Sequence, residues 1–237
     1  MELLSDVVRW AGAAAEEIAP RGQVLSYLRV APPSMVDVHA GQYMILVQAV
    51  AFVDSVTDAQ DILSVFDRAP IRNHGKEVTR CRPTTIPQLQ VSLGELYPEP
   101  RRYAVDHMWL GDDRLDDLLA LAAKHLRTVP SEDSNLLFLL VPPSGEELPD
   151  MAFSRTDRIF FSPNAIWEGS RHDAVNMRWV EDVVKDFEPF ATGYYVNETD
   201  LFRSSARAAG AFSQESWEKL QSIAENYDPE GLFTSFP

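Results

Sequence analysis

The residues that most often build cofactor sites are spaced too widely in this sequence to do so. Its eleven glycines are never closer than ten positions apart. A loop that wraps a nucleotide pyrophosphate needs several glycines within about six residues, so no glycine-rich phosphate loop can form. The five histidines include no pair with metal-site spacing, and no Gly-x-Ser-x-Gly motif is present. We therefore expect neither a metal site nor a hydrolase nucleophile elbow.

One segment near the C-terminus does combine side chains of suitable chemistry. Tyr195, Asn197 and Glu198 lie close together in the run GYYVNETD. An amide both donates and accepts hydrogen bonds. A carboxylate can take a proton from a substrate, and burial raises its pKa toward the working pH range. Tyr103 and Trp109, on a predicted strand upstream, are further candidates for a surface that faces substrate.

Apolar periodicity predicts the elements that position these residues. Helices are expected over 2–19, 54–69, 112–129, 171–187 and 214–226, and strands over 23–30, 42–53, 101–110, 135–141, 158–167 and 193–197. The strand over 158–167 should break near Ser162 and Pro163, and residues 84–100 are rich in turn formers. Several neighbouring strands are joined by turns too short for crossover helices. We therefore expect an α+β fold, with a largely antiparallel sheet, helices covering one face, and a C-terminal helical cap.

Charge and cysteine content narrow the function classes. The 237 residues include 21 basic and 36 acidic side chains, a net charge of −15. So negative a chain is a poor partner for nucleic acid or an anionic membrane surface, and no apolar run approaches the length of about eighteen residues that a membrane span needs. The single cysteine, Cys81, rules out an internal disulfide and suits a cytoplasmic protein.

The C-terminal part also carries a pattern of motifs. GYYVNETD starts at Gly193, a helix follows, and YDPEGLF starts at Tyr227; upstream, MAFSR occupies 151–155. This order resembles the end of berberine-bridge-enzyme-like flavoproteins, in the vanillyl-alcohol-oxidase superfamily. Those chains have an Ala-Phe-x-x-Arg segment, a Tyr-x-Asn-Tyr-x-Asp strand, a helix and Tyr-Asp-Pro-x-x-x-Phe. The resemblance covers most of the chain and is sharp from about residue 151 onward.

The resemblance implies an FAD-dependent oxidoreductase that oxidises an alcohol or amine carbon of a small-molecule substrate by hydride transfer to flavin N5. It divides the chain into a substrate-binding domain, 1–190, without its first strand, and a berberine-like C-terminal segment, 191–237. The family's flavin-binding domain, which carries the glycine-rich loop, has no counterpart in this sequence. FAD is therefore the implied cofactor, and a separate flavin-binding chain the implied partner.

By resemblance, Tyr195 and Asn197 border the flavin. Glu198 stands where the family usually has a second tyrosine, often the catalytic base. Structural alternatives stay open: Asn197 as a turn cap, Tyr195, Tyr103 and Trp109 as core aromatics, and Glu198 as a solvated side chain at a site that has lost its base.

Two alternatives to the enzyme also stay open, namely a flavin-free binding module for a small molecule or protein, and an inactive remnant. Without a flavin domain, Leu232, Phe233 and Phe236 should lack a partner surface and favour association. The one basic stretch, 68–82, reads as a solvated loop, with contact to a flavin phosphate or an acidic partner as the alternative.

Overall fold

The computed structural model describes residues 2–31, 42–70, 81–94, 96–143, 151–153 and 156–233. Four features of the sequence interpretation lie wholly or partly outside these ranges: the turn at Pro32 and Pro33, most of the basic stretch 68–82, the last two residues of the 151–155 motif, and Phe236.

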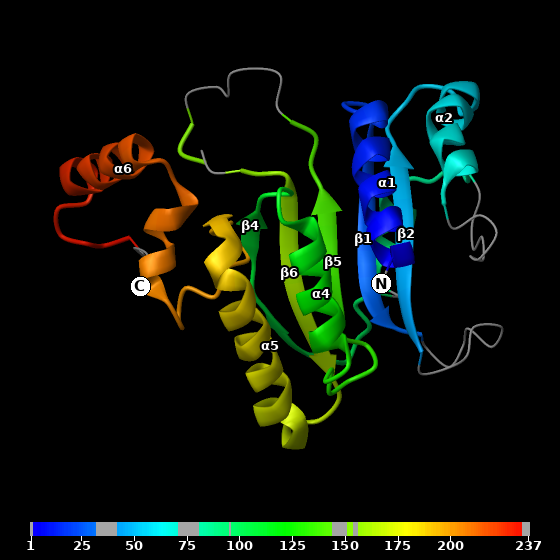
Figure 1. Cartoon of the computed structure of the whole chain (residues 1–237). Helices are drawn as coiled ribbons and strands as arrows, with labels where there is room; N and C mark the ends of the chain where they lie inside the picture. Colours follow the sequence, from blue (N-terminus) through cyan, green and yellow to red (C-terminus); the bar gives the residue numbers. More distant parts are fainter. Residues whose placement is uncertain are drawn as a thin grey trace.

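A single antiparallel sheet organises the chain (Figure 1). Its strands are β1 (Gly22–Val30), β2 (Tyr43–Ala51), β3 (Arg102–Val105), β4 (Met108–Leu110), β5 (Asn135–Leu140), β6 (Ile159–Trp167) and β7 (Ala191–Gly193). Their order is β2-β1-β5-β6-β4-β7, with β3 pairing with β6 beside β4. Each of these pairs is antiparallel.

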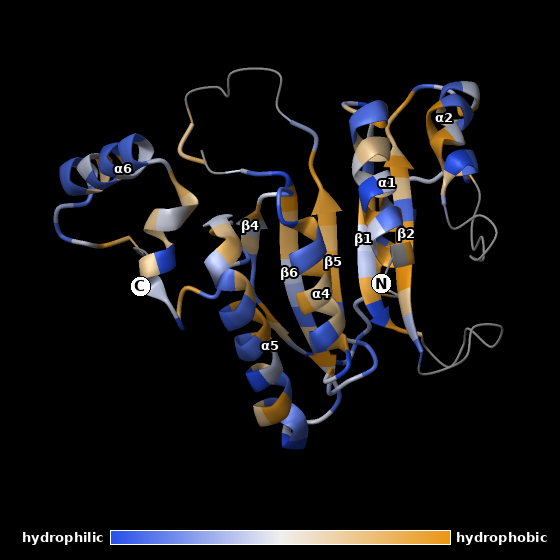
Figure 2. Ribbon diagram, in the orientation of Figure 1, coloured by the Kyte–Doolittle hydropathy of each residue, from blue (hydrophilic) through white to orange (hydrophobic). Residues whose placement is uncertain are grey.

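Three helices cover one face of this sheet: α1 (Glu2–Ile18), α4 (Leu115–Leu126) and α5 (Asp173–Phe187) (Figure 1). In α1, buried Val8, Ala11 and Ile18 recur at helical spacing and pack on the strands. The outward sides of the helices are hydrophilic, whereas the strands behind them are largely hydrophobic (Figure 2). The predicted α+β architecture with helices on one face is thus confirmed.

Three further α-helices are α2 (Val56–Leu63), followed by a 3-10 turn (Ser64–Arg68), α3 (Ile86–Gly94) and α6 (Gln214–Tyr227). α2 and the turn after it contribute Ile62 and Val65 to the core, whereas α3 and α6 bury no residue. Within the described ranges, no helix is long and apolar enough to cross a membrane.

Strand register places a second set of side chains on the opposite side of the sheet, which we call the second face. Neighbouring residues on a strand alternate between faces. Leu28 belongs to the helix-covered core, so Tyr27 points the other way. Tyr27 pairs with Leu137, and Leu137 with Ser162. This second face carries most residues discussed below.

The strand predicted over 101–110 is in fact two strands, and the expected break in 158–167 is absent. β6 runs unbroken through Pro163, and the interruption falls on its partner, between Val105 and Met108. Proline has no N–H to donate to a partner strand, so the ladder opens opposite Pro163. Asp106 and His107 fill the opening and are free to make other contacts.

One segment without an assignment and one predicted strand remain. Residues 84–100, rich in turn formers and given no helix or strand from sequence, contain helix α3, whose described residues are all at least partly exposed. The last strand is Ala191–Gly193 rather than 193–197, and a turn follows it in which the Glu198 and Thr199 amides donate to the Tyr195 carbonyl. Helix α6, with Ser213 as its N-cap, ends at Tyr227 before Asp228-Pro229 as predicted.

Candidate functional site

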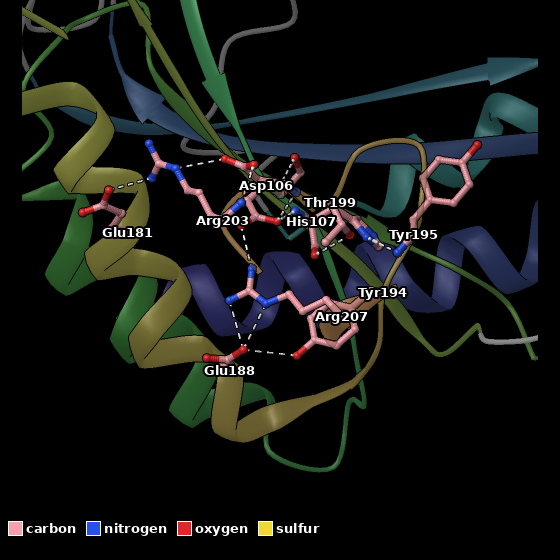
Figure 3. A network of polar contacts seen from close by, with 11 residues as sticks. Asp106, His107, Glu181, Glu188, Tyr194, Tyr195, Thr199, Arg203 and Arg207 are labelled. Carbon is pink, nitrogen blue, oxygen red and sulfur yellow. Dashed lines mark hydrogen bonds and ion pairs between the residues drawn. The ribbon is translucent and has the colours of Figure 1, made fainter. Parts of the chain in front are cut away.

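The turn at 195–200 is anchored to the opening between β3 and β4 (Figure 3). Asp106 Oδ1 accepts from the Asp200 amide at 3.1 Å and from the His107 amide at 2.8 Å. The Thr199 hydroxyl donates to the His107 carbonyl at 3.3 Å. The Asp106 side chain and the His107 carbonyl therefore provide the 195–200 turn with hydrogen bonds that a neighbouring strand would otherwise supply.

A buried ion pair completes the anchor. Arg207 Nη1 lies 2.8 Å from Asp106 Oδ2, and their side chains are 11% and 4% exposed. Arg207 also donates to Glu188 at the end of α5, and its guanidinium lies over the Tyr194 ring (Figure 3). The network ties three separate parts of the chain together.

His107 is fully buried at the centre of this arrangement. Its Nδ1 accepts from the Tyr195 amide at 2.9 Å. Burial lowers the pKa of His107 to about 3, so the ring is neutral at physiological pH. An accepting Nδ1 on a neutral ring requires the proton to sit on Nε2, and that N–H has no hydrogen-bond partner among the described residues.

An aromatic cluster surrounds His107 on the second face; its other members are Trp109, Phe153, Phe160 and Tyr195. Ring centroids of His107 and Phe160 are 3.9 Å apart, and those of His107 and Trp109 are 5.4 Å apart. Trp109 Nε1 is also buried with no partner among the described residues. The cluster thus holds two N–H donors without a hydrogen-bond partner among the described residues, which is energetically costly in a protein interior.

The structure brings some predicted site residues together and separates others. Tyr195 is half-buried in the aromatic cluster, and its hydroxyl accepts from Asn197 Nδ2 at 3.1 Å. Asn197 is itself exposed. Trp109 is 6% exposed and belongs to the same cluster, whereas Tyr103 is 40% exposed and donates from its hydroxyl to the Pro98 carbonyl.

Glu198 lies at the surface of the turn, yet partial desolvation raises the pKa of its carboxyl. The phenol of Tyr97 is within electrostatic range of both Glu198 and Tyr103, and burial raises the pKa of Tyr97.

Sequence reasoning missed His107 and Asp106. The spacing of the histidines bears only on metal binding, which it does not favour. A usable signal was present, because His107 and Trp109 are two apart on a predicted strand and so share a face. Asp106 carried no such signal, since its role depends on Arg207, about a hundred positions away.

The second face fits the ring system of FAD better than its phosphates. The edge of a flavin ring presents both acceptors and a donor, which an amide such as Asn197 and N–H groups such as those of His107 and Trp109 can match. No glycine-rich loop is available for the pyrophosphate. Three or more potential metal ligands do not come together anywhere in the described part of the chain.

Comparison with known proteins gives two curated relatives in sequence. The chain is 28% identical over 148 residues to FAD-linked oxidoreductase ptmO of Penicillium ochrochloron, which is 62% of this chain and 32% of the relative. It is 28% identical over 147 residues to FAD-linked oxidoreductase penO of Penicillium crustosum, with the same shares. No family model matches the chain.

Solved structures share the fold. A berberine-bridge-enzyme-like protein of Arabidopsis thaliana superposes with a TM-score of 0.71 at 12% identity, covering 99% of this chain and 53% of that one. For 6-hydroxy-D-nicotine oxidase of Arthrobacter nicotinovorans the TM-score is 0.65 at 13% identity, covering 96% and 50%. These comparisons confirm the predicted resemblance. The matched part spans about a third of the curated relatives and about half of the solved structures.

Proposed function

We propose that this chain, which resembles part of the berberine-bridge-enzyme-like FAD-linked oxidoreductases, forms the substrate-binding wall of such an enzyme. Residues 1–190 form the substrate-binding part and 191–237 the berberine-like segment. A flavin-binding domain supplied by another stretch of polypeptide completes the site. The observation that carries the proposal is the second face itself. There the anchored turn at Tyr195 and Asn197 meets two N–H donors, His107 Nε2 and Trp109 Nε1, that have no partner among the described residues.

The reaction class proposed is oxidation of an alcohol or amine carbon. When bound, FAD supplies the hydride acceptor. The chain's own residues do the rest: Tyr195 and Asn197 border the ring, and Tyr103 and Trp109 face the substrate. Glu198 removes the substrate proton, and its raised pKa supports that role because a base works best when its pKa is near the operating pH.

Flavin binding tests the proposal directly. The purified chain is mixed with FAD, with and without the separately expressed flavin-binding domain of one of the curated relatives, and its visible absorption is followed through gel filtration. We expect flavin to co-elute with this chain when the added domain is present. Absence of flavin and of alcohol or amine oxidation in both mixtures would favour the alternative of a flavin-free binding module.

The base is tested by Glu198→Gln in the active assembly. Loss of a general base lowers the rate by about 10²–10⁴-fold, and the acid limb of the pH–rate profile should disappear. Glu168→Gln, at a carboxylate that is 81% exposed, is the matched control. This variant should leave the rate and the acid limb of the pH–rate profile unchanged. An acid limb that persists in Glu198→Gln would show that another group takes the proton.

A further inference from the structure

A row of buried polar side chains crosses the second face away from the aromatic cluster. Arg29 on β1 pairs with Asn135 on β5, and Asn135 pairs with Asn164 on β6. Their exposures are 7%, 0% and 4%. Directly paired residues in antiparallel strands have Cβ atoms about 5 Å apart, so the three side chains are neighbours.

The amide orientations in this row are fixed. Asn164 Nδ2 donates to the Ser162 carbonyl at 3.0 Å, and a carbonyl can only accept. The same nitrogen donates to Asn135 Oδ1 at 3.2 Å. Asn135 Nδ2 is thereby left pointing elsewhere as a donor, and it has no partner among the described residues.

Arg29 is a buried charge that makes no ion pair with any of the described residues. Its Nε and Nη2 donate to the carbonyls of Val30 and Glu132 at 3.3 and 3.4 Å, both long for such bonds. No carboxylate of the described residues lies within ion-pair distance of Arg29. Asp133 is in electrostatic range of it but is paired with Arg101 at 2.9 Å. A buried guanidinium in this state is costly unless an anion joins it.

The two buried phenols in this region do not supply that anion. Burial raises the pKa of Tyr27 to about 12 and also raises that of Tyr97. Both phenols therefore stay neutral and leave the positive charge of Arg29 unchanged.

We propose that Arg29 and Asn135 form a subsite for the carboxylate of a small organic acid, which the site would take as its substrate. A planar carboxylate accepts from a guanidinium through two oxygens and can accept from the Asn135 amide as well. One positive charge matches one carboxylate. The ligand's role as substrate rests on the proposed function, whereas its binding does not.

The test needs no flavin. Isothermal titration calorimetry on the full chain compares mandelate with mandelamide, which has a neutral amide in place of the carboxylate. We expect mandelate to bind about 10–100-fold more tightly, the range for losing a hydrogen bond to a charged group. Equal affinities, no binding of mandelate, or tighter binding of inorganic phosphate would overturn the proposal. FAD binding can succeed or fail independently, so the two proposals are distinguishable.

Two variants locate the site. Arg29→Gln should reduce mandelate binding to the level of mandelamide, and Arg9→Gln, at an exposed ion pair on α1, should not. Asn135→Asp would place a permanent carboxylate beside Arg29. That variant should lose mandelate binding while its melting temperature rises, because the buried charge gains a partner. Retained binding with an unchanged melting temperature would contradict the assignment even if Arg29→Gln does not fold.

Discussion

His107 makes the stability of the chain depend on pH in a calculable direction. Burial lowers its pKa from 6.5 to about 3. Between these values the unfolded chain binds a proton that the folded chain does not, so folding loses stability as pH falls through this window. The loss is about 1.4 kcal/mol per pH unit, or about 2 kcal/mol at pH 5.

Urea denaturation at pH 7 and pH 5 measures this effect. His107→Asn keeps an acceptor for the Tyr195 amide but cannot titrate, so its free energy of unfolding should fall by about 2 kcal/mol less than that of the unchanged chain. The pKa of His125 is also lowered by burial. Because His125 is present in both the variant and the unchanged chain, its contribution to the pH dependence cancels in the comparison. His172→Asn, at an exposed histidine, should behave like the unchanged chain. If the pH curves of His107→Asn and the unchanged chain run parallel, the pKa of His107 does not differ between the folded and unfolded chains, which contradicts the prediction.

At the scale of single residues, the sequence indicated a candidate segment of the site but not the distant residues that contact it or lie on the same face. The motif around Tyr195, Asn197 and Glu198 singled out a segment that the structure places beside the aromatic cluster of the second face, because local motifs are readable without a fold. Arg29 and Asn135 could not be recognised, since their pairing appears only when β1 lies beside β5. A strand register shifted by one residue would put both on the helix-covered face.

Among the elements, the ion pair of Asp106 with Arg207 holds the 195–200 turn against the sheet. Arg207→Met leaves Asp106 as an unpaired buried charge, which should cost about 3–5 kcal/mol of folding stability. The matched control is Arg203→Met, because Arg203 pairs with Glu181 and Asp200 at side chains that are more exposed. Arg203→Met should lower the free energy of unfolding by less than about 1 kcal/mol.

Chemical denaturation compares the two variants, and hydrogen exchange of the 195–200 amides shows whether the turn is released. Asp106→Asn combined with Arg207→Met removes both charges and keeps the acceptor for the Asp200 amide. The double variant should therefore be more stable than Arg207→Met alone. Equal stability losses in the Arg207 and Arg203 variants would mean that the pair is not effectively buried.

The same scale explains which elements were predictable. Long segments with a strong apolar signal were found within a few residues: α1 by its helical apolar stripe and β2 by its continuous apolar, β-branched run. Helix α3 lacks a buried face, so periodicity gave nothing to detect. The division into β3 and β4 depends on Pro163 of a strand more than fifty positions away, which no local pattern reveals.

At the scale of the whole molecule, α1, α4 and α5 cover one face of the sheet, and most of the candidate groups lie on the other. A structure with two different faces can place a substrate against a partner domain without disturbing its core. The chain spans about half of the solved structures it matches. In the proposed function, the flavin-binding domain completes the site at the second face.

The end of the described chain offers a last test of how this molecule meets others. Leu232 and Phe233 are 79% and 76% exposed, and their amides donate to the Asp228 carboxylate at 2.7 and 2.9 Å, which fixes both side chains at the surface. Exposed apolar groups favour association, whereas the charge of −15 opposes it at low salt. Self-association should therefore appear as salt screens the repulsion.

Sedimentation velocity at low and high salt follows this balance. In the unchanged chain the oligomeric fraction should rise with salt. The double variant Leu232→Ser with Phe233→Ser should stay monomeric under both conditions. Salt still weakens the charge repulsion in this variant, but the apolar side chains that would hold two copies together are gone. Val91→Ser, which removes an equally exposed apolar side chain from α3, should associate like the unchanged chain. If the double variant associates to the same extent, the contact lies on another surface, and the terminal turn plays no part in recognising a partner.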